Sequence, residues 1–465
     1  MSPPMVPAEF WLTPELCDAF AAAHIGRVVR AYRRHPHHTV RYGAGGISQT
    51  LLGQWLGLTQ AQVSRIENGP PVKNLDTLAH WARVLRVPAE LLWFDLPGCR
   101  RTSAAGAAPE LALHGGEWLP RDSTELAELV CTGGELAISP ETVTRLVHEW
   151  LVTEPPQLVE VRSGRRISDR LVSRVERRTA ELRRMDDFVA GGDLHGLVER
   201  ELNATAGLLR EASYTEILGR RLLAALGELC QLAGWVVGDA GRYGAAARYY
   251  TTGVKAAHAA GSSALAANLI STLAYQVANV GNPRDAVLLA QSADSGPTRT
   301  TATARALFKE RLAWTYARAG DRRATERTLA AAETGYEQRV PDDDPEWVYW
   351  LDEAELTVMA GRCHVELGLP ERAVPLLAGA LAHYDERHSR ELALYTSWLA
   401  EAQLQLGAVD AAVAAATRTL ELTSRITSAR TDDRVNLLRR KLQPYRDVPA
   451  VADFEAMVRE LNSSN

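Results

Sequence analysis

The clearest pattern of apolar and polar positions lies at residues 47–69, where two short amphipathic segments are separated by a glycine. The first segment begins after Ser48, a suitable helix N-cap, and Gly57 can adopt positive φ and end it. Its apolar stripe consists of Leu51, Leu52, Trp55 and Leu56. Thr59 is placed to cap the second segment, which Gly69 and two prolines end. The pattern predicts two short helices joined by a tight turn.

The second of these helices carries polar side chains on the side that its apolar positions leave free. Ala61, Val63 and Ile66 are expected to face inward, and the outer side then presents Gln60, Gln62, Ser64 and Arg65. Glutamine can bond adenine and arginine can bond guanine in the major groove of DNA. Gln49 begins the preceding helix, where a backbone phosphate can bind. We therefore expect these helices to bind double-stranded DNA; the alternative is a module for protein contact.

Two further helices are predicted downstream, at residues 75–87 and 88–94. The apolar face of the first consists of Leu75, Leu78, Ala79, Ala82 and Leu85. With the two helices before them, they predict a small helical domain.

Charge supports a polyanion as the partner of this domain. The whole chain has a formal net charge of -5, but residues 27–41 hold five arginines, three histidines and no acid. A basic patch on a weakly acidic chain is typical of a protein that meets a polyanion through one domain. The alternative is a solvated helix face.

The run ISQTLLGQWLGLTQAQVSRIENG, followed by LAHWARVLRVPAELLW, resembles the helix-turn-helix domain of the phage-repressor-like (XRE) family over residues 18–97. The resemblance implies a transcription regulator, and the widely spaced cysteines fit a reducing cytoplasm. The DNA contacts that we expect are Ser48, Gln49, Thr59, Gln60, Gln62, Ser64, Arg65 and Asn68. By the resemblance, Gln49 contacts phosphate and Glu67 is structural. The sequence departs from the family at Gly53, where alanine is usual and a small loss of helix stability is expected, and in a longer insertion at 34–46.

A repeat of about 40 residues follows in the C-terminal half. Glycines suited to turns between helices recur at Gly241, Gly281, Gly320, Gly368 and Gly407. Five residues later an alanine follows in four units, at Ala246, Ala286, Ala373 and Ala412. Thr325 takes that place in the third unit and is expected to weaken it. The pattern resembles tetratricopeptide repeats, whose helix–turn–helix units bury their apolar faces against neighbours and stack into a solenoid.

The chain is therefore predicted to be all-α, with an N-terminal helix-turn-helix domain followed by a tetratricopeptide-like solenoid. The predicted parts are a DNA-binding domain at 15–97, a linker at 98–138, a helical connecting region at 139–215, repeats at 216–445 and a C-terminal helix or tail at 446–465. Ser139 and Pro140 are suited to begin a helix in the connecting region, and Thr427–Tyr445 is expected to cap the repeats.

The concave side of the repeats is the second candidate site. If the first helix of each unit lines it, the inward positions include Trp235, Asp239, Asn268, Tyr275, Asn279, Trp314, Arg318 and Arg362. Aromatic rings, amides and both charge signs suit a signal peptide or a small organic ligand. The alternative is a face that is merely solvated or closed by another segment.

Two smaller features each leave an alternative open. Asp186 and Asp187 could suggest a metal site, but we expect solvated acids near a helix end. Trp347, Tyr349 and Trp350 crowd one turn, and we expect them to pack on a neighbouring helix rather than to meet a partner or ligand.

Enzyme signatures are missing from the sequence. The five cysteines, Cys17, Cys99, Cys131, Cys230 and Cys363, lie far apart, which disfavours disulfides and zinc sites. There is no GxxxxGK phosphate loop, GxSxG elbow or zinc-protease histidine pair. We expect no enzyme activity, cofactor, metal, signal peptide or membrane span.

Two further runs, LAGWVVGDAGRYGAAARYY and EWVYWLDEAEL, resemble long actinobacterial regulators that join an XRE domain to tetratricopeptide-like repeats and are often connected with development or secondary metabolism. The architecture is also similar to quorum regulators whose repeats bind a peptide. Because one short helix contacts few bases, we expect a homodimer. The leading hypothesis is a transcriptional regulator whose repeats dimerise and sense a signal. The alternative is a repeat-based adaptor.

Overall fold

The computed structural model divides into two compact units, residues 1–108 and 109–465. It describes residues 6, 10–11, 13–22, 24–43, 45–69, 72, 74–85, 87, 111–131, 138–187, 191–382, 384, 388–423 and 429–464. Each unit has its own apolar core.

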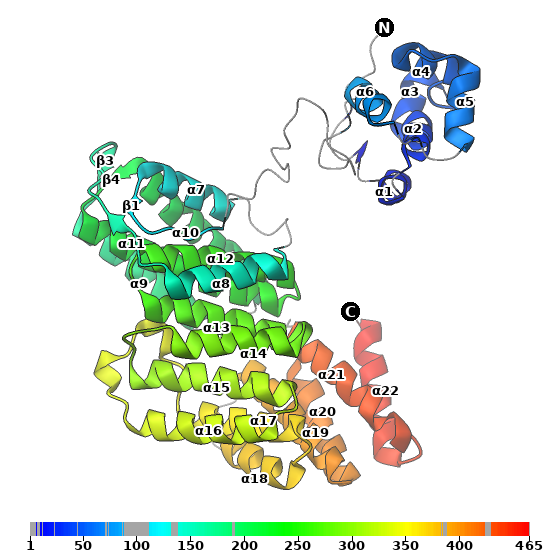
Figure 1. Cartoon of the computed structure of the whole chain (residues 1–465). Helices are drawn as coiled ribbons and strands as arrows, with labels where there is room; N and C mark the ends of the chain where they lie inside the picture. Colours follow the sequence, from blue (N-terminus) through cyan, green and yellow to red (C-terminus); the bar gives the residue numbers. More distant parts are fainter. Residues whose placement is uncertain are drawn as a thin grey trace. The chain divides into compact units, whose positions relative to one another are not determined.

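The first unit is a bundle of short helices (Figure 1). Its helices are α1 (Pro14–Ala21), α2 (Ile25–Arg34), the 3-10 helix η2 (Pro36–His38), α3 (Thr39–Tyr42), α4 (Gln49–Leu56), α5 (Gln60–Asn68) and α6 (Leu75–Leu85). The prediction of helices after Ser48, after Thr59 and from residue 75 is confirmed. The helix predicted at 88–94 lies outside the described residues.

The ends of α4 and α5 follow from local chemistry. Ser48 Oγ accepts from the backbone N–H of Leu51, and Gly57 ends α4 with φ of 71°. That left-handed backbone is costly for any residue with a Cβ. Thr59 caps α5 through its hydroxyl, which accepts from the N–H of Gln62. Residue types at the caps therefore fix the tight turn.

The second unit is built almost entirely from helices. They are α7 (Pro120–Cys131), α8 (Pro140–Val152), α9 (Asp169–Met185), α10 (Gly191–Glu211), α11 (Glu216–Asp239), α12 (Tyr243–Ala259), α13 (Ser263–Val280), α14 (Pro283–Ser295), α15 (Ala302–Arg318), α16 (Arg322–Glu337), α17 (Glu353–Glu366), α18 (Pro370–Leu381), α19 (Ser389–Gln405), α20 (Val409–Thr423), α21 (Ala429–Leu442) and α22 (Pro449–Ser464). Short 3-10 helices occur at η4 (Pro341–Asp343), η5 (Glu346–Val348) and η6 (Gln443–Tyr445). Strands β1 (Glu117–Trp118) and β2 (Gln157–Leu158) pair in parallel, as do β3 (Arg165–Arg166) and β4 (Ala212–Ser213).

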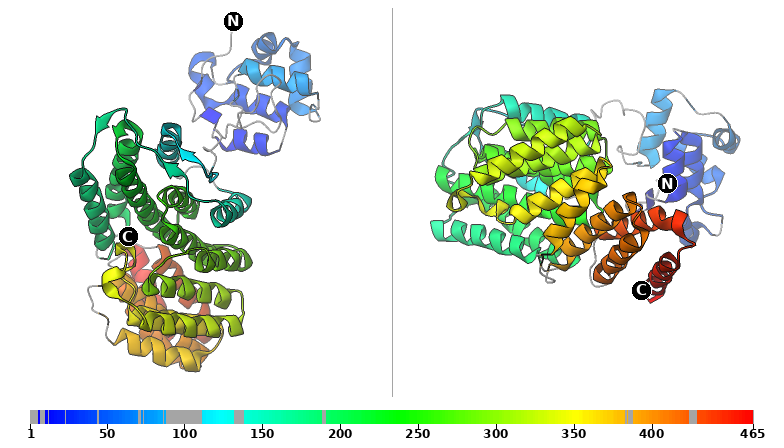
Figure 2. Two further views of the ribbon diagram at one scale, coloured as in Figure 1. Left: turned by 60° about the vertical axis from the view of Figure 1, so that its left-hand side comes forward. Right: turned by 90° about the horizontal axis from the view of Figure 1, so that it is seen from below.

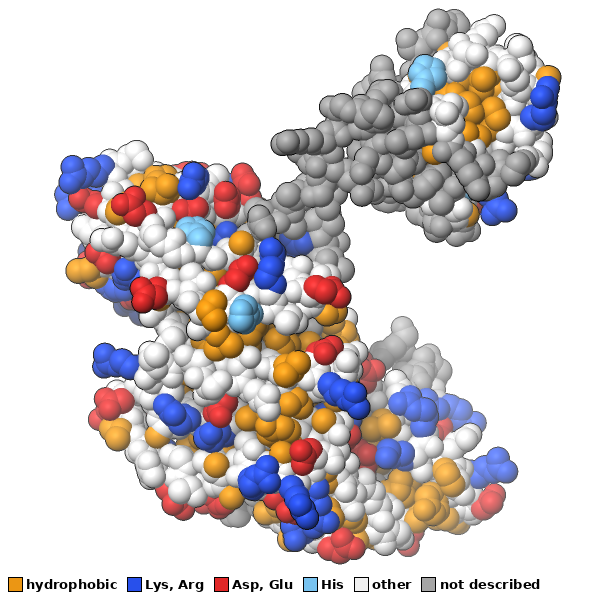
Figure 3. Space-filling view, viewed as in Figure 1, with side chains coloured by type: hydrophobic (Ala, Val, Ile, Leu, Met, Phe, Trp, Pro, Cys, Tyr) orange, Lys and Arg blue, Asp and Glu red, His pale blue; other side chains and the backbone are white. Residues whose placement is uncertain are grey.

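From α11 onward the helices form antiparallel pairs that stack into a solenoid-like array (Figure 2). From α11 to α21 each helix packs against the next in the chain, and α22 packs against α20. Helices α11, α13, α15, α17, α19 and α21 also contact one another in sequence as an inner layer. The all-α, solenoid-like fold is confirmed. On the face shown in Figure 3, both charge signs are interspersed over this unit.

The repeated glycines make most of the turns between paired helices. Four of them, Gly241, Gly320, Gly368 and Gly407, have φ between 67° and 77°, a region that a Cβ disfavours. Gly281 has φ of -124°, and there Asn282 caps α14 ahead of Pro283. The turn between α13 and α14 is therefore made without a left-handed glycine.

The small residues after each turn lie where two helices meet. Ala246, Ala286, Ala373 and Ala412 are at most 1% exposed. Thr325 is also fully buried, and its hydroxyl donates to the carbonyl oxygen of Asp321 at 2.8 Å. Because this bond satisfies the hydroxyl, nothing in the structure shows the weakening expected for the third unit.

Part of the predicted linker at 98–138 is folded. Helix α7 packs against α10, and Leu126 and Leu129 are buried. The linker prediction is wrong for residues 111–131, because the apolar positions of α7 cover the connecting region. Residues 98–110 and 132–137 lie outside the described part of the chain.

One helix in the described part of the chain, α11, is long and apolar enough to cross a membrane by length and composition. However, 78% of its most apolar window is buried by the rest of the unit. A buried core helix passes the same test, and the packing of α11 against α10, α12 and α13 accounts for its composition.

Candidate nucleic-acid interface and interior pocket

Helix α5 presents a polar face to solvent. Val63 is buried, Ile66 is half-buried and Glu67 faces inward at 5% exposure. The outward residues are Gln60, Ala61, Gln62, Arg65 and Asn68, with Ser64 half-buried. The prediction that Ala61 faces inward is wrong, because its side chain is exposed. The inward side of α5 is formed instead by Val63 and Glu67, which are four residues apart and so lie on the same face of the helix.

A chain of side-chain bonds joins this face to two other helices. Gln60 Nε2 donates to Gln49 Oε1 at 2.7 Å, and Gln49 Nε2 donates to Glu67 Oε2 at 2.9 Å. Arg33, on α2, donates to both oxygens of Glu67, at 2.8 and 2.9 Å. The two glutamines therefore have fixed orientations before any ligand arrives.

Glu67 is ionised within this network. Burial opposes its charge, but hydrogen bonds from Arg33 and Gln49 outweigh that penalty and lower its pKa. This agrees with the structural role that the family resemblance implies for Glu67.

The cap residues of α5 are partly committed to the helix itself. Gln62 Oε1 accepts from the N–H of Thr59 at 2.8 Å, which completes a capping box. At the other end, Asn68 Nδ2 donates to the carbonyl oxygen of Ser64, and Asn68 Oδ1 accepts from Arg30 at 3.3 Å. Gln60 and Arg65 remain the longest outward side chains of the helix that are outside these caps.

Gly53 has a steric role in the turn between α4 and α5. An added Cβ would lie 2.5 Å from the carbonyl oxygen of Leu58, and the N–H of Leu58 donates to the Gly53 carbonyl. The close backbone approach accounts for a glycine here, beyond the helix-propensity cost that the sequence predicts.

The basic stretch at 27–41 divides between surface and core. Arg27, Arg30 and Arg34 are exposed, whereas Arg33 is buried against Glu67. His38 is 1% exposed, and burial lowers its pKa to about 4, so it is neutral at physiological pH. Only part of the predicted basic patch is therefore available to a polyanion.

The second unit contains a cavity of about 500 Å³ among its inner helices. Six carboxyl side chains line it, namely Asp186, Asp187, Glu310, Asp352, Glu355 and Glu391. Four described arginines line it as well, namely Arg183, Arg311, Arg362 and Arg390. Its aromatic walls include Trp235, Tyr275, Tyr349, Trp350, Tyr384 and Tyr395.

Three of the predicted groove residues line this cavity: Trp235, Tyr275 and Arg362. The rings of Trp235 and Tyr275 are tilted by 30° with their centroids 6.3 Å apart, and the Arg362 guanidinium lies 5.7 Å from the centroid of the Tyr275 ring. The Arg362 guanidinium lies over the rings of Trp314 and Trp398 and donates to the Tyr275 hydroxyl at 2.8 Å.

The other predicted groove residues are used inside the protein. Asn268 is buried and accepts from Arg311, while the exposed Asn279 accepts from the indole of Trp314. Arg318 pairs with Glu366 and also donates to the Ala278 carbonyl.

Trp314 is 1% exposed, within a core cluster of the solenoid, and Asp239 is 3% exposed, with Arg390 3.9 Å away. None of these five is among the residues that line the cavity.

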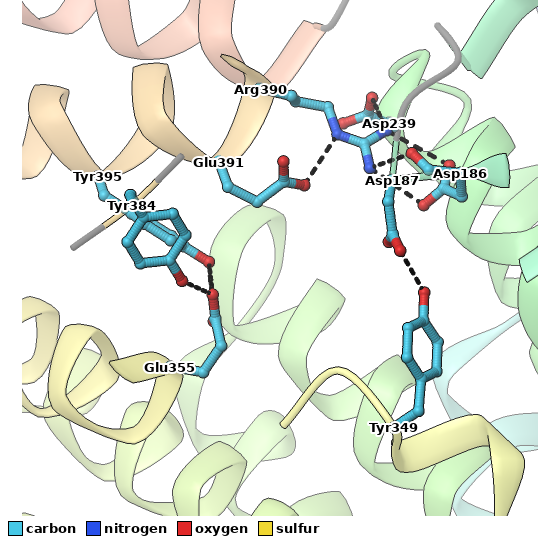
Figure 4. Close-up of polar contacts among 9 residues, drawn as sticks. All are labelled: Asp186, Asp187, Asp239, Tyr349, Glu355, Tyr384, Arg390, Glu391 and Tyr395. Atoms are coloured by element: carbon cyan, nitrogen blue, oxygen red, sulfur yellow. Dashed lines mark hydrogen bonds and ion pairs between the residues drawn. The ribbon is translucent and has the colours of Figure 1, made fainter. Parts of the chain in front are cut away.

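The expectation of solvated acids at Asp186 and Asp187 is wrong. Asp186 is 8% exposed and pairs with Arg390 at 3.1 Å, as Figure 4 shows. Asp187 accepts from the hydroxyl of Tyr349 at 2.6 Å, and burial raises its pKa. A contact between segments about two hundred residues apart along the chain has no signature in local sequence. No group of metal-binding side chains is found in the described part of the chain.

The aromatic turn at 347–350 divides between core and cavity. Trp347 stacks on Phe308 with centroids 6.3 Å apart, as expected for packing on a neighbour. Tyr349 and Trp350 line the cavity. The expectation of packing on a neighbouring helix is confirmed for Trp347, whereas contact of Tyr349 and Trp350 with a ligand stays a prediction.

Glu355 is held between two tyrosines. The hydroxyls of Tyr384 and Tyr395 donate to its carboxylate, the latter at 2.7 Å (Figure 4). Burial raises the pKa of Glu355 to about 7 in spite of these bonds. Its side chain is half-buried and faces the cavity.

Glu310 is the most deeply buried carboxyl group of the cavity. It is 2% exposed, and its carboxyl group has no hydrogen bond to any described residue. Burial raises its pKa to about 8 against the opposing charge of Arg311.

Glu310, Tyr395 and Arg390 are not among the inward positions predicted from the spacing of the turn glycines. For Glu310 the adjacent charges Lys309, Glu310 and Arg311 in α15 were the signal available in the sequence; Tyr395 and Arg390 had none.

Comparison with known families matches residues 43–92 to the helix-turn-helix family model. No curated protein matches the chain. The matched segment contains α4, the turn and α5, and it supports an XRE-like helix-turn-helix domain of a DNA-binding transcription regulator.

Proposed function

We propose that the protein is a cytoplasmic, sequence-specific transcriptional regulator in which α5 enters the major groove of DNA. The observation that carries this is the exposed polar face of α5, with Gln60 held against Gln49 at the adjacent helix start. The helix-turn-helix match over 43–92 supports it.

In this proposal some of the predicted residues contact base edges and others contact the DNA backbone. Gln60 and Arg65 bond base edges, because they project from the outer face. Gln49 and the exposed Ser48 meet phosphates at the α4 N-terminus. The remaining contacts to the backbone come from Thr59, Gln62, Ser64 and Asn68.

We also propose that two chains bind a two-fold operator, with the solenoid supplying the dimer surface and a signal site. One short helix contacts few bases, so a second half-site adds affinity and specificity. The pairing of helices at a spacing near 40 residues supports tetratricopeptide-like repeats. The cavity of about 500 Å³ is within the size range of small-molecule sites and supports a ligand.

Selection from a random DNA pool tests the proposal, with full-length protein at physiological salt and the stoichiometry measured on the best sequence. The expected result is a two-fold motif that binds two chains with a steep salt dependence. A motif bound by one chain would overturn the dimer. No enriched sequence and a shallow salt slope would overturn DNA binding and favour the adaptor.

A further inference from the structure

We propose that the cavity of the second unit binds a small organic cation: an amine with an apolar or aromatic body, held by Glu310, Glu355 and Asp187. This inference rests on the proposed signal-sensing function and names the chemical class of the signal. A cation is favoured because some carboxyl groups around the cavity have no ion pair within the protein, whereas the arginines there already have partners.

Four carboxyl groups at the cavity, Asp187, Glu310, Asp352 and Glu355, lack an ion pair with any described basic side chain. Of these, Asp352 is exposed and accepts from the backbone N–H of Glu355 as the N-cap of α17. Glu355 accepts hydrogen bonds from two tyrosine hydroxyls, and Asp187 accepts one from Tyr349. Glu310 has no hydrogen bond to its carboxyl group from the described residues, although it is 2% exposed and lines the cavity. A buried carboxyl group without a partner is costly, and a cationic ligand would remove that cost.

The arginines of the cavity, in contrast, each have an ion pair or hydrogen bonds within the protein, although the Nε atoms of Arg183 and Arg362 have no hydrogen-bond partner in the described part of the structure. Arg390 pairs with Asp186, and Arg183 pairs with Glu228 at 3.4 Å. Arg311 donates away from the cavity, to groups on α13 that include Ser271 at 2.8 Å.

Arg362 lies over tryptophan rings and bonds Tyr275. An anionic ligand would have to compete with these partners, whereas a cation would not.

The walls suit the remainder of such a ligand. Tyr384 and Tyr395 meet edge to face at 5.4 Å beside Glu355, and Trp350 and Tyr349 line another part of the cavity. Aromatic faces attract ammonium groups and supply apolar contact area. About 500 Å³ accommodates a molecule of this class.

Thermal melting of the full-length protein with matched probes tests the inference. The probes are phenethylamine, tryptamine and cadaverine, each with its alcohol and carboxylate counterparts at millimolar concentration. We expect amines to raise the melting temperature of the second unit, because a ligand that binds only the folded state stabilises it. Alcohols and carboxylates are expected to have little effect. A preference for the carboxylates, or no response to any amine, would overturn the inference.

Charge-neutral variants identify the groups that bind. Glu355→Gln and Glu310→Gln preserve shape and should each weaken amine binding at least tenfold, whereas the exposed Glu333→Gln on α16 should not. Equal weakening by Glu333→Gln, or no weakening in either cavity variant, would contradict the assignment. If Glu310→Gln does not fold, Asp187→Asn provides the same measurement at another part of the cavity.

The DNA-binding measurement separates this inference from the proposed function. Amine binding that leaves operator affinity unchanged would support the ligand class and overturn the sensing role. Operator binding by a protein that ignores every amine would overturn the ligand class alone.

Discussion

Gln60 Nε2 donates to Gln49 Oε1 at 2.7 Å, so the first residue of α5 is bonded to the first residue of α4. Gln49 in turn bonds Glu67, which pairs with Arg33. The side chain proposed to contact a base and the one proposed to contact a phosphate are thus oriented by the same network. Such preorganisation lowers the entropy cost of binding.

The double variant Gln60→Ala, Arg65→Ala should lose specific DNA binding while its melting temperature stays near that of the wild type. Each lost base contact is expected to cost about 1–3 kcal/mol of discrimination. Fluorescence anisotropy on the selected operator and on a scrambled duplex measures the loss. Gln54→Ala, at an exposed position of α4, is the matched control. Unchanged operator affinity in the double variant would refute α5 as the contact helix.

Removing one partner of the Arg33–Glu67 pair should destabilise the first unit severely. Glu67→Ala leaves a buried guanidinium unpaired, and the expected loss in free energy of unfolding is about 3–5 kcal/mol. Replacing both partners, as in Arg33→Met, Glu67→Leu, should restore most of that stability. Chemical denaturation of each variant measures this, and equal losses in the single and double variants would contradict it.

The double variant Arg33→Met, Glu67→Leu also tests whether the network has a role in DNA binding apart from its role in folding. It should fold yet bind its operator more weakly than the wild type, because Gln49 loses the acceptor that orients it. Wild-type operator affinity in a folded Arg33→Met, Glu67→Leu protein would show that the network has no role in binding.

Glycine substitutions should separate turn strain from helix propensity in the solenoid. Gly368→Ala places a Cβ at φ of 67° and should destabilise the second unit by about 1–2 kcal/mol. Gly335→Ala, within α16 and with open space around the added Cβ, should stabilise it by about 1 kcal/mol. Urea denaturation of both variants measures the pair, and effects of the same sign would contradict the assigned turn geometry.

The second unit should lose stability as pH rises from about 4.5 toward 8. Burial raises the pKa of Glu310 to about 8, with Arg311, Arg362 and Glu355 as its charged neighbours. In that range the folded state binds more protons at Glu310 than the unfolded chain, so the free energy of unfolding falls with pH.

Melting curves between pH 5 and 9 check this expectation. Glu310→Gln should have a shallower decline than the wild type because it cannot ionise. The same slope in both proteins would show that the group is ionised throughout.

Local chemistry in the sequence predicted much of the first unit. Ser48, Gly57 and Thr59 act within a few residues of themselves, so the caps of α4 and α5 follow from residue type alone. The same holds for the repeated glycines, since a left-handed turn needs only its own residue to lack a Cβ. Gly281 is the exception, because the following Asn-Pro pair offered a second way to begin a helix.

The cavity required the tertiary structure. Spacing along the inner helices placed Trp235, Tyr275 and Arg362 together, because a regular repeat brings equivalent positions into register. Other residues of the predicted groove do not line the cavity. Asn268 on α13, for example, accepts a hydrogen bond from Arg311 on α15.

The sequence by itself determined the helices, their caps and most of the polar face of α5, because these depend on contacts a few residues apart. The inward place of Glu67 depended on Arg33, from another helix. Only the tertiary structure decided which charged groups are buried and paired. Asp186 meets Arg390 across about two hundred residues, and Glu310 is left without a hydrogen bond to its carboxyl group from the described residues. Electrostatic energies depend on such long-range neighbours and on burial, and neither is encoded in local pattern.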